Sequence, residues 1–110
     1  MKVALSHENG ISVISIEGSI DGKTAPLVRQ EISPTLETAK SVIVDLSKVD
    51  YLSSAGLRLL LLIYREIAAK NGKLILLAVS EDIRTVMSHT GFLNFFTLVG
   101  SMPEALQALS

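Results

Sequence analysis

The alternation of hydrophobic and polar residues divides the chain into short strands and longer helices. Two strands, over residues 2–6 and 11–17, flank Asn9-Gly10, which is a hairpin turn signal because both residues tolerate positive φ. The apolar runs 41–46 and 73–79 have the aliphatic and β-branched composition of strands buried on both faces. The pattern therefore predicts a hairpin followed by strands at the centre of a sheet.

Four helical stretches separate and follow these strands, and each begins with a Ser or Thr that can cap its first turn. Residues 18–23 and 47–52 are expected to connect neighbouring elements. The first helix covers residues 24–33, where Pro34 predicts a kink or an early end. The second covers residues 53–70 and stops at Asn71-Gly72, and the third covers residues 80–90 and stops at Gly91. A short strand at 95–98 then precedes a terminal helix that starts at Ser101. The order β-β-α-β-α-β-α-β-α is typical of an α/β layer fold with a mixed sheet.

Composition narrows the class of protein. The 110 residues have the length of one domain, and 48% hydrophobic against 19% charged residues excludes a disordered chain. The net charge of −1 gives no basic excess for binding nucleic acid. With no Cys and only two His, disulfide scaffolds and cysteine-based zinc sites are excluded, and we expect neither a metal nor a cofactor.

The apolar content does not predict a membrane protein. The most apolar helix, residues 57–69, carries Arg58, Arg65 and Glu66, whereas a spanning helix needs about 20 nearly uninterrupted apolar residues. The N-terminus turns polar at residue 6 and has no apolar region of signal-peptide length. We therefore expect a cytoplasmic protein that acts without a membrane.

The start of the helix at Ser53 is the best candidate for a functional surface. If Ser53 caps this helix, Ser54 is its first residue and has a hydroxyl free to face solvent, next to unpaired backbone N–H groups. On a helical wheel one side carries Ser54, Arg58, Leu61, Leu62 and Arg65, a mixture that suits protein docking. The alternative is purely structural: a serine pair that caps, arginines on a solvated stripe, and Gly56 permitting close packing of helix on sheet.

An enzyme is not expected. Ser-Ser-Ala-Gly lacks the Gly-x-Ser-x-Gly pattern of a nucleophile elbow, and no phosphate-binding glycine loop occurs. Nothing in the sequence brings His7 or His89 to Ser54, although a small hydrolase using Ser54 stays open as an alternative.

Residues 42–60 begin with Val-Ile-Val-Asp-Leu-Ser and end with Ser-Ser-Ala-Gly-Leu-Arg-Leu-Leu. This segment resembles the signature of STAS domains, and above all that of the stand-alone bacterial anti-sigma factor antagonists. The resemblance includes Gly18-Ser19-Ile20-Asp21 and residues 88–92, so it spans the chain. It implies one STAS domain over residues 1–110, with a mixed central sheet of about five strands and about four helices.

The resemblance also implies a function. Such a domain is a binding protein whose partner, an anti-sigma factor with serine kinase activity, phosphorylates the serine two positions before the glycine, here Ser54. The unphosphorylated form binds the anti-sigma factor and frees the sigma factor, and a PP2C-type phosphatase resets the switch. The acidic residue after the second strand, here Asp21, is expected near the acceptor.

Two departures from the family pattern affect the acceptor. Many members have Asp where this chain has Ser53, and Ser where it has Ala55. Ser53 is therefore a competing acceptor. A STAS scaffold or accessory subunit in another signalling or transport complex is the alternative function. The edge strand at residues 2–6 and the exposed leucines also permit a homodimer.

Overall fold

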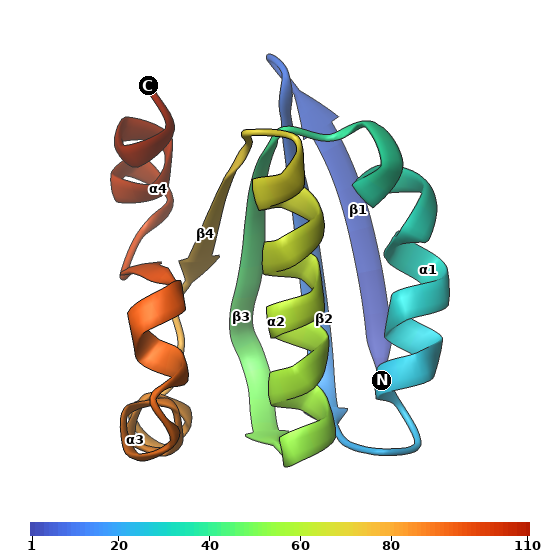
Figure 1. The fold of residues 1–110 in the computed structure, drawn as a ribbon, viewed down its shortest axis with the longest axis vertical. Coiled ribbons are helices and arrows are strands. Elements are labelled where there is room, and N and C mark those ends of the chain that lie inside the picture. Colours follow the sequence, from blue (N-terminus) through green and yellow to red (C-terminus); the bar gives the residue numbers. More distant parts are fainter.

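The computed structural model covers residues 1–110, and its centre is one five-stranded sheet in the order β1-β2-β3-β4-β5 (Figure 1). β1 and β2 form an antiparallel hairpin, and every later neighbour is parallel. The strands are β1 (Lys2–Glu8), β2 (Ile11–Ile20), β3 (Ser41–Leu52), β4 (Lys73–Leu77) and β5 (Thr97–Val99). The predicted α/β architecture with a mixed sheet is confirmed.

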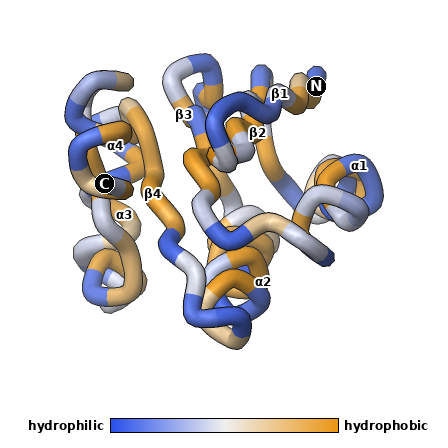
Figure 2. Tube along the Cα trace, turned by 90° about the horizontal axis from the view of Figure 1, so that it is seen from above, coloured by the Kyte–Doolittle hydropathy of each residue, from blue (hydrophilic) through white to orange (hydrophobic).

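Four helices and one 3-10 turn cover this sheet unequally. They are α1 (Ala25–Thr38), α2 (Ser54–Ala69), α3 (Glu81–Thr90), η1 (Phe92–Phe95) and α4 (Met102–Leu109). Apolar residues of α1, α2 and α3 share the large core with the sheet, whereas Ala105 of α4 packs on its other face against Ile43, Ile75 and Leu77. Figure 2 shows α1 and α2 side by side along one face. β1 contributes no residue to the cluster on that second face, whereas Ile11 and Val13 of β2 pack against it.

The core is aliphatic. Its large, fully buried side chains come from the sheet and from the helices that cover it, and they include Ile14, Ile16, Val28, Leu46, Leu60, Ile63 and Met87. Two edge-to-face contacts join Tyr64 of α2 to Phe95 and Phe96, with ring centroids 5.8 Å apart in each pair. None of the helices is both long and apolar enough to cross a membrane.

The prediction that residues 47–52 form a connection was wrong, because β3 continues through them to Leu52. The predicted connection at residues 18–23 is shorter than expected, because β2 continues to Ile20. The pairing register slips twice, so that β3 contains two extra residues opposite β2. At the first slip the Asp45 carboxylate accepts a hydrogen bond from the Ser47 N–H, at 2.9 Å. We call the paired residues 17–20 and 48–52 the β2–β3 ribbon, because β4 pairs with β3 only as far as Asp45.

The prediction that the first helix ends early, near Ser33, was also wrong. α1 runs through Pro34 to Thr38, and Pro34 lies on its exposed side. Buried residues at helical spacing, Val28, Ile32 and Leu36, stand on both sides of the proline. Their packing on the sheet outweighs the one backbone hydrogen bond that the proline removes.

Several element ends differ locally from the prediction. Thr24 does not cap α1 with its side chain; its hydroxyl donates to the Ser19 carbonyl at 2.8 Å. Beyond α2, Asn71 rather than Gly72 takes the left-handed conformation, with φ of 59°. Gly72 is instead needed because a Cβ there would collide with the Lys40 carbonyl. The last strand begins at Thr97, since Phe95 belongs to η1.

Candidate functional site

The first turn of α2 is fixed against the end of β2. The Ser53 N–H donates a hydrogen bond of 2.9 Å to the Ile20 carbonyl. Gly56 is buried, and a Cβ at this position would lie 2.5 Å from Leu52 Cδ1 and 2.8 Å from the Ile20 oxygen. Gly56 therefore allows the close packing of helix on sheet, as its structural reading predicts, and its burial leaves no surface for a partner.

The two serines at this turn have different surroundings. Ser53 is half-buried, and its hydroxyl accepts a hydrogen bond from the Gly56 N–H at 3.4 Å, as expected of the N-cap. Ser54 is exposed as the first residue of α2, and no hydrogen bond of the structure involves its hydroxyl. Of the two predicted acceptors, Ser54 is thus the more accessible.

Asp21 lies in the loop beside this turn, directly after Ile20. Its carboxylate accepts hydrogen bonds from the backbone N–H groups of Thr24, at 3.0 Å, and Lys23, at 2.9 Å. These two bonds lower the pKa of Asp21 below its ordinary value, with a smaller contribution from the Lys23 charge. The loop therefore presents a fixed negative charge at neutral pH next to the start of α2.

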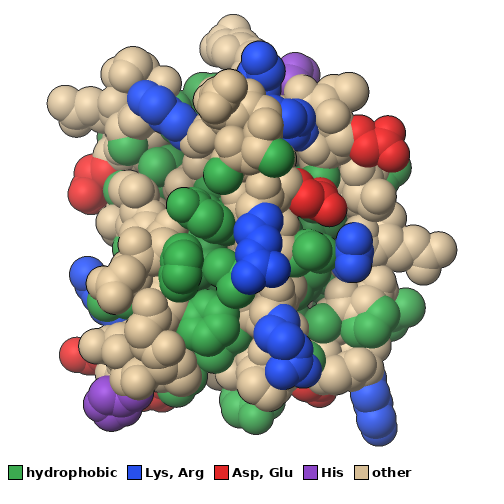
Figure 3. All heavy atoms as spheres, viewed as in Figure 1, with side chains coloured by type: hydrophobic (Ala, Val, Ile, Leu, Met, Phe, Trp, Pro, Cys, Tyr) green, Lys and Arg blue, Asp and Glu red, His purple; other side chains and the backbone are tan.

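A shallow groove of about 470 Å³ runs between α1 and α2 from this loop. It is lined by Gly22, Ala25, Pro26, Arg29, Ala55, Arg58, Leu59 and Leu62. Arg29 also contacts Glu66, with 3.8 Å between guanidinium nitrogen and carboxylate oxygen, and this ion pair links the two helices. Figure 3 shows basic side chains standing among hydrophobic ones over α2.

The remaining predicted residues extend this surface along α2. Arg58 and Arg65 are exposed and take part in no salt bridge. Leu61 and Leu62 are half-buried and belong to neither core cluster, so part of each side chain faces solvent. Only Leu62 of the two leucines lines the groove.

The contribution of α1 was missed in the sequence. Pro26 and Arg29 form one wall of the groove, about 30 residues before the other wall. The signal that could have found them is topological. Successive right-handed crossovers that advance in one direction along a parallel sheet place their helices side by side on the same face.

Neither histidine meets the serines. His7 Nδ1 lies 3.0 Å from the Ser12 hydroxyl, at the start of β2 and thus at the opposite end of that strand from Asp21. His89 lies exposed in the last turn of α3. No hydrogen bond joins either ring to Ser53 or Ser54.

Comparison with known proteins gives this surface its context. The family model described as the STAS domain matches residues 2–105. The chain belongs to the STAS domain family. The helix start at Ser53, the loop at Asp21 and the groove between α1 and α2 all lie within the matched residues, and the fold predicted from the resemblance is confirmed.

Relatives of this STAS domain have related names. A protein of Bordetella bronchiseptica named as an anti-sigma factor antagonist, BtrV, is 28% identical over 109 residues, which cover 98% of this chain and 94% of the relative. The crystal structure of an anti-sigma factor antagonist from Mycobacterium paratuberculosis is 29% identical, with a TM-score of 0.88 over 98% of this chain and 92% of that one.

A third comparison concerns the fold alone. SpoIIAA of Bacillus, an anti-sigma factor antagonist, has solved structures in its unphosphorylated and phosphorylated forms, both 23% identical to this STAS domain. Their TM-scores are 0.76, over 97% of this chain and 96% of that one, and 0.75, over 99% and 100%.

Proposed function

We propose that this STAS domain is an anti-sigma factor antagonist switched by phosphorylation of Ser54. Unphosphorylated, it binds an anti-sigma factor with serine kinase activity and releases the sigma factor, which regulates transcription. A PP2C-type phosphatase restores the binding form. The observation that carries the proposal is the exposed, unbonded hydroxyl of Ser54 at the start of α2, beside the groove between α1 and α2.

The fold tolerates a phosphate at Ser54. Phosphorylation adds a charge of about −1.5 to −2 and three acceptor oxygens. At the first residue of a helix this charge is stabilised by the unpaired N–H groups and the positive end of the helix dipole. Arg58 lies one helical turn further on the same side and has no competing salt bridge. We therefore expect the phosphorylated protein to keep its fold.

The partner is affected instead. A surface that fits a small neutral hydroxyl would have to bury a dianion, next to the ionised carboxylate of Asp21. A buried charge without a new counter-ion costs several kcal/mol, on the order of 2–5. The switch thus acts by direct interference at the docking surface, with Arg58, Leu61, Leu62 and Arg65 as the neighbouring contacts.

Ser53 has a different role in this proposal. Its hydroxyl accepts the Gly56 N–H, so it caps α2 and is half-buried. Phosphorylation there would require the cap to open first. We therefore assign the acceptor role to Ser54 and the capping role to Ser53.

The acceptor can be identified with serine kinases of the anti-sigma factor type from the same genome. The wild-type protein and the Ser54→Ala and Ser53→Ala variants are incubated with each kinase and ATP, and the products are mapped by mass spectrometry. We expect one phosphate on the wild type and on Ser53→Ala, and none on Ser54→Ala. A phosphate mapped to residue 53 would overturn the acceptor assignment.

The switch itself is tested by binding to the same kinases. Ser54→Asp is expected to weaken binding at least about tenfold while circular dichroism stays that of the wild type. A variant that loses its folded spectrum contradicts direct interference. Wild-type protein that binds no such kinase and accepts no phosphate would favour the scaffold role, and reaction of Ser54 with an active-serine probe would favour the hydrolase.

A further inference from the structure

β1 is an edge strand that the rest of the molecule leaves uncovered. Six of its seven residues are exposed, and only Val3 is half-buried. Leu5, at the middle of the strand, is 44% exposed. One side of β1 pairs with β2, so the backbone N–H and C=O groups on the other side have no partner strand. Such an edge is a template for pairing with another chain.

The sequence of β1 is complementary to itself. When two copies run antiparallel about a two-fold axis at Leu5, all seven residues of each strand find a partner. Lys2 then lies opposite Glu8 of the second copy, Ala4 opposite Ser6, and Leu5 opposite Leu5. Moving the axis by one residue, to Ala4 or Ser6, shortens the pairing to five residues and separates the lysine from the glutamate. The longest register is thus the one in which the charges match.

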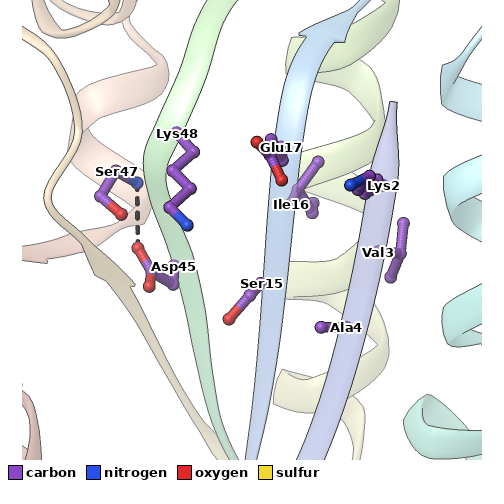
Figure 4. Close-up of a pocket in the computed structure, with 9 residues that line it drawn as sticks. All are labelled: Lys2, Val3, Ala4, Ser15, Ile16, Glu17, Asp45, Ser47 and Lys48. Carbon is purple, nitrogen blue, oxygen red and sulfur yellow. Dashed lines mark hydrogen bonds between the residues drawn. The ribbon is translucent and has the colours of Figure 1, made fainter.

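A row of alternating charges inside the molecule continues through this contact. On the open face of the sheet, Lys2 pairs in register with Glu17 of β2, and Glu17 pairs with Lys48 of β3. Figure 4 shows the three side chains around the hollow on this face. Glu8 of a second copy would stand next to Lys2 and extend the row to Glu–Lys–Glu–Lys. Opposite charges on neighbouring strands stabilise the pairing, and like charges weaken it.

The symmetry fixes where the helices of the two copies lie. A two-fold axis perpendicular to the sheet keeps both copies of α1 on one face and both open faces on the other. The two exposed Leu5 side chains, which point to the helix side like their cross-strand neighbour Ile14, come into contact there. The contact does not include Ser54 or the groove between α1 and α2.

We propose that two copies of this chain associate through antiparallel pairing of β1 with β1, centred on Leu5, to form a dimer with one continuous ten-stranded sheet. The proposal is independent of the proposed function, because the surface of α2 is free in both the monomer and the dimer. Failure of one therefore leaves the other standing.

The register is tested with introduced cysteines, since the chain has no Cys of its own. Leu5→Cys places two thiols opposite each other at the axis, within the Cα separation of about 4.4–6.8 Å that a disulfide needs. Ala4→Cys and Ser6→Cys are the matched controls. Each alone puts its two thiols two residues out of register, about 8 Å apart, whereas a mixture of the two variants places them opposite each other.

We expect mild oxidation to cross-link Leu5→Cys, and the mixture of Ala4→Cys and Ser6→Cys, at least about tenfold faster than either control alone. The products are separated on non-reducing gels. Equal rates for all variants would overturn the register. Sedimentation of the wild-type protein as a monomer up to millimolar concentration would overturn the dimer.

Charge reversal tests the ion pairs. Lys2→Glu and Glu8→Lys each set like charges against each other at both symmetry-related contacts, and each is expected to raise the dimer dissociation constant about tenfold or more. An equimolar mixture restores opposite charges at both contacts and should form heterodimers more tightly than either variant forms homodimers, although the new glutamate also faces Glu17 of its own chain. Arg84→Glu, an exposed reversal on α3, serves as the control and should change nothing. A mixture no tighter than its components would contradict the pairing.

Discussion

At the scale of single residues, position within one helical turn separates two chemically identical side chains. Ser53 and Ser54 both carry a hydroxyl, but the first accepts the Gly56 N–H and the second faces solvent. The sequence could predict this division, because the N-cap of a helix and its first residue point differently. Helix capping alone could not rank the two as acceptors, and only the family resemblance favoured Ser54, since the exposure of each side chain depends on how the chain folds around it.

Gly56→Ala tests how tightly the first turn of α2 is held. Its new methyl group would lie 2.8 Å from the Ile20 carbonyl oxygen, so α2 would have to shift. We expect the free energy of unfolding to fall by about 1–3 kcal/mol, measured by urea denaturation. Gly22→Ala is the matched control, because a Cβ there meets no atom within 4 Å, and its effect should stay within about 0.5 kcal/mol. Equal effects would contradict close packing at Gly56.

At the scale of elements, local signals failed where tertiary packing competed with them. Pro34 is an ordinary helix-ending signal, yet α1 passes through it. The two extra residues at the register slips of β3 also break the regular alternation of side chains, so that Val49 and Leu52 are buried three residues apart. A search for a period of two residues cannot recognise a bulged strand. The strand and helix order needed no such detail and was predicted correctly.

Pro34→Ala should stabilise the protein. The substitution restores a backbone N–H to the exposed side of α1 and removes the clash of the proline ring with the preceding turn. Part of this gain is offset because alanine leaves the unfolded chain more flexible. We expect a net increase of about 1–2 kcal/mol in the free energy of unfolding, visible as a higher thermal midpoint. Ser33→Ala, its exposed neighbour, should change stability by only a few tenths of a kcal/mol.

At the scale of the whole molecule, topology brings together what the sequence keeps apart. The docking stripe of α2 was predicted, but the groove beside it needs Pro26 and Arg29 of α1. The single helix on the far face, α4, packs over β4 and its neighbours, and no residue of β1 belongs to the apolar cluster on that face. No periodicity along the chain contains this information, because it depends on which face each crossover takes.

The β2–β3 ribbon has a consequence for dynamics. Beyond Asp45, β3 has no β4 partner, and both sides of the candidate site, Asp21 and Ser53, are attached to the end of this two-stranded extension. Local opening should therefore require less free energy here than in the centre of the sheet. We expect the amides of residues 48–52 to exchange with deuterium at least about tenfold faster than those of 42–46, and equal protection would contradict this. The site can then adjust its shape to different partners, because the β2–β3 ribbon opens and closes while the rest of the five-stranded sheet stays paired.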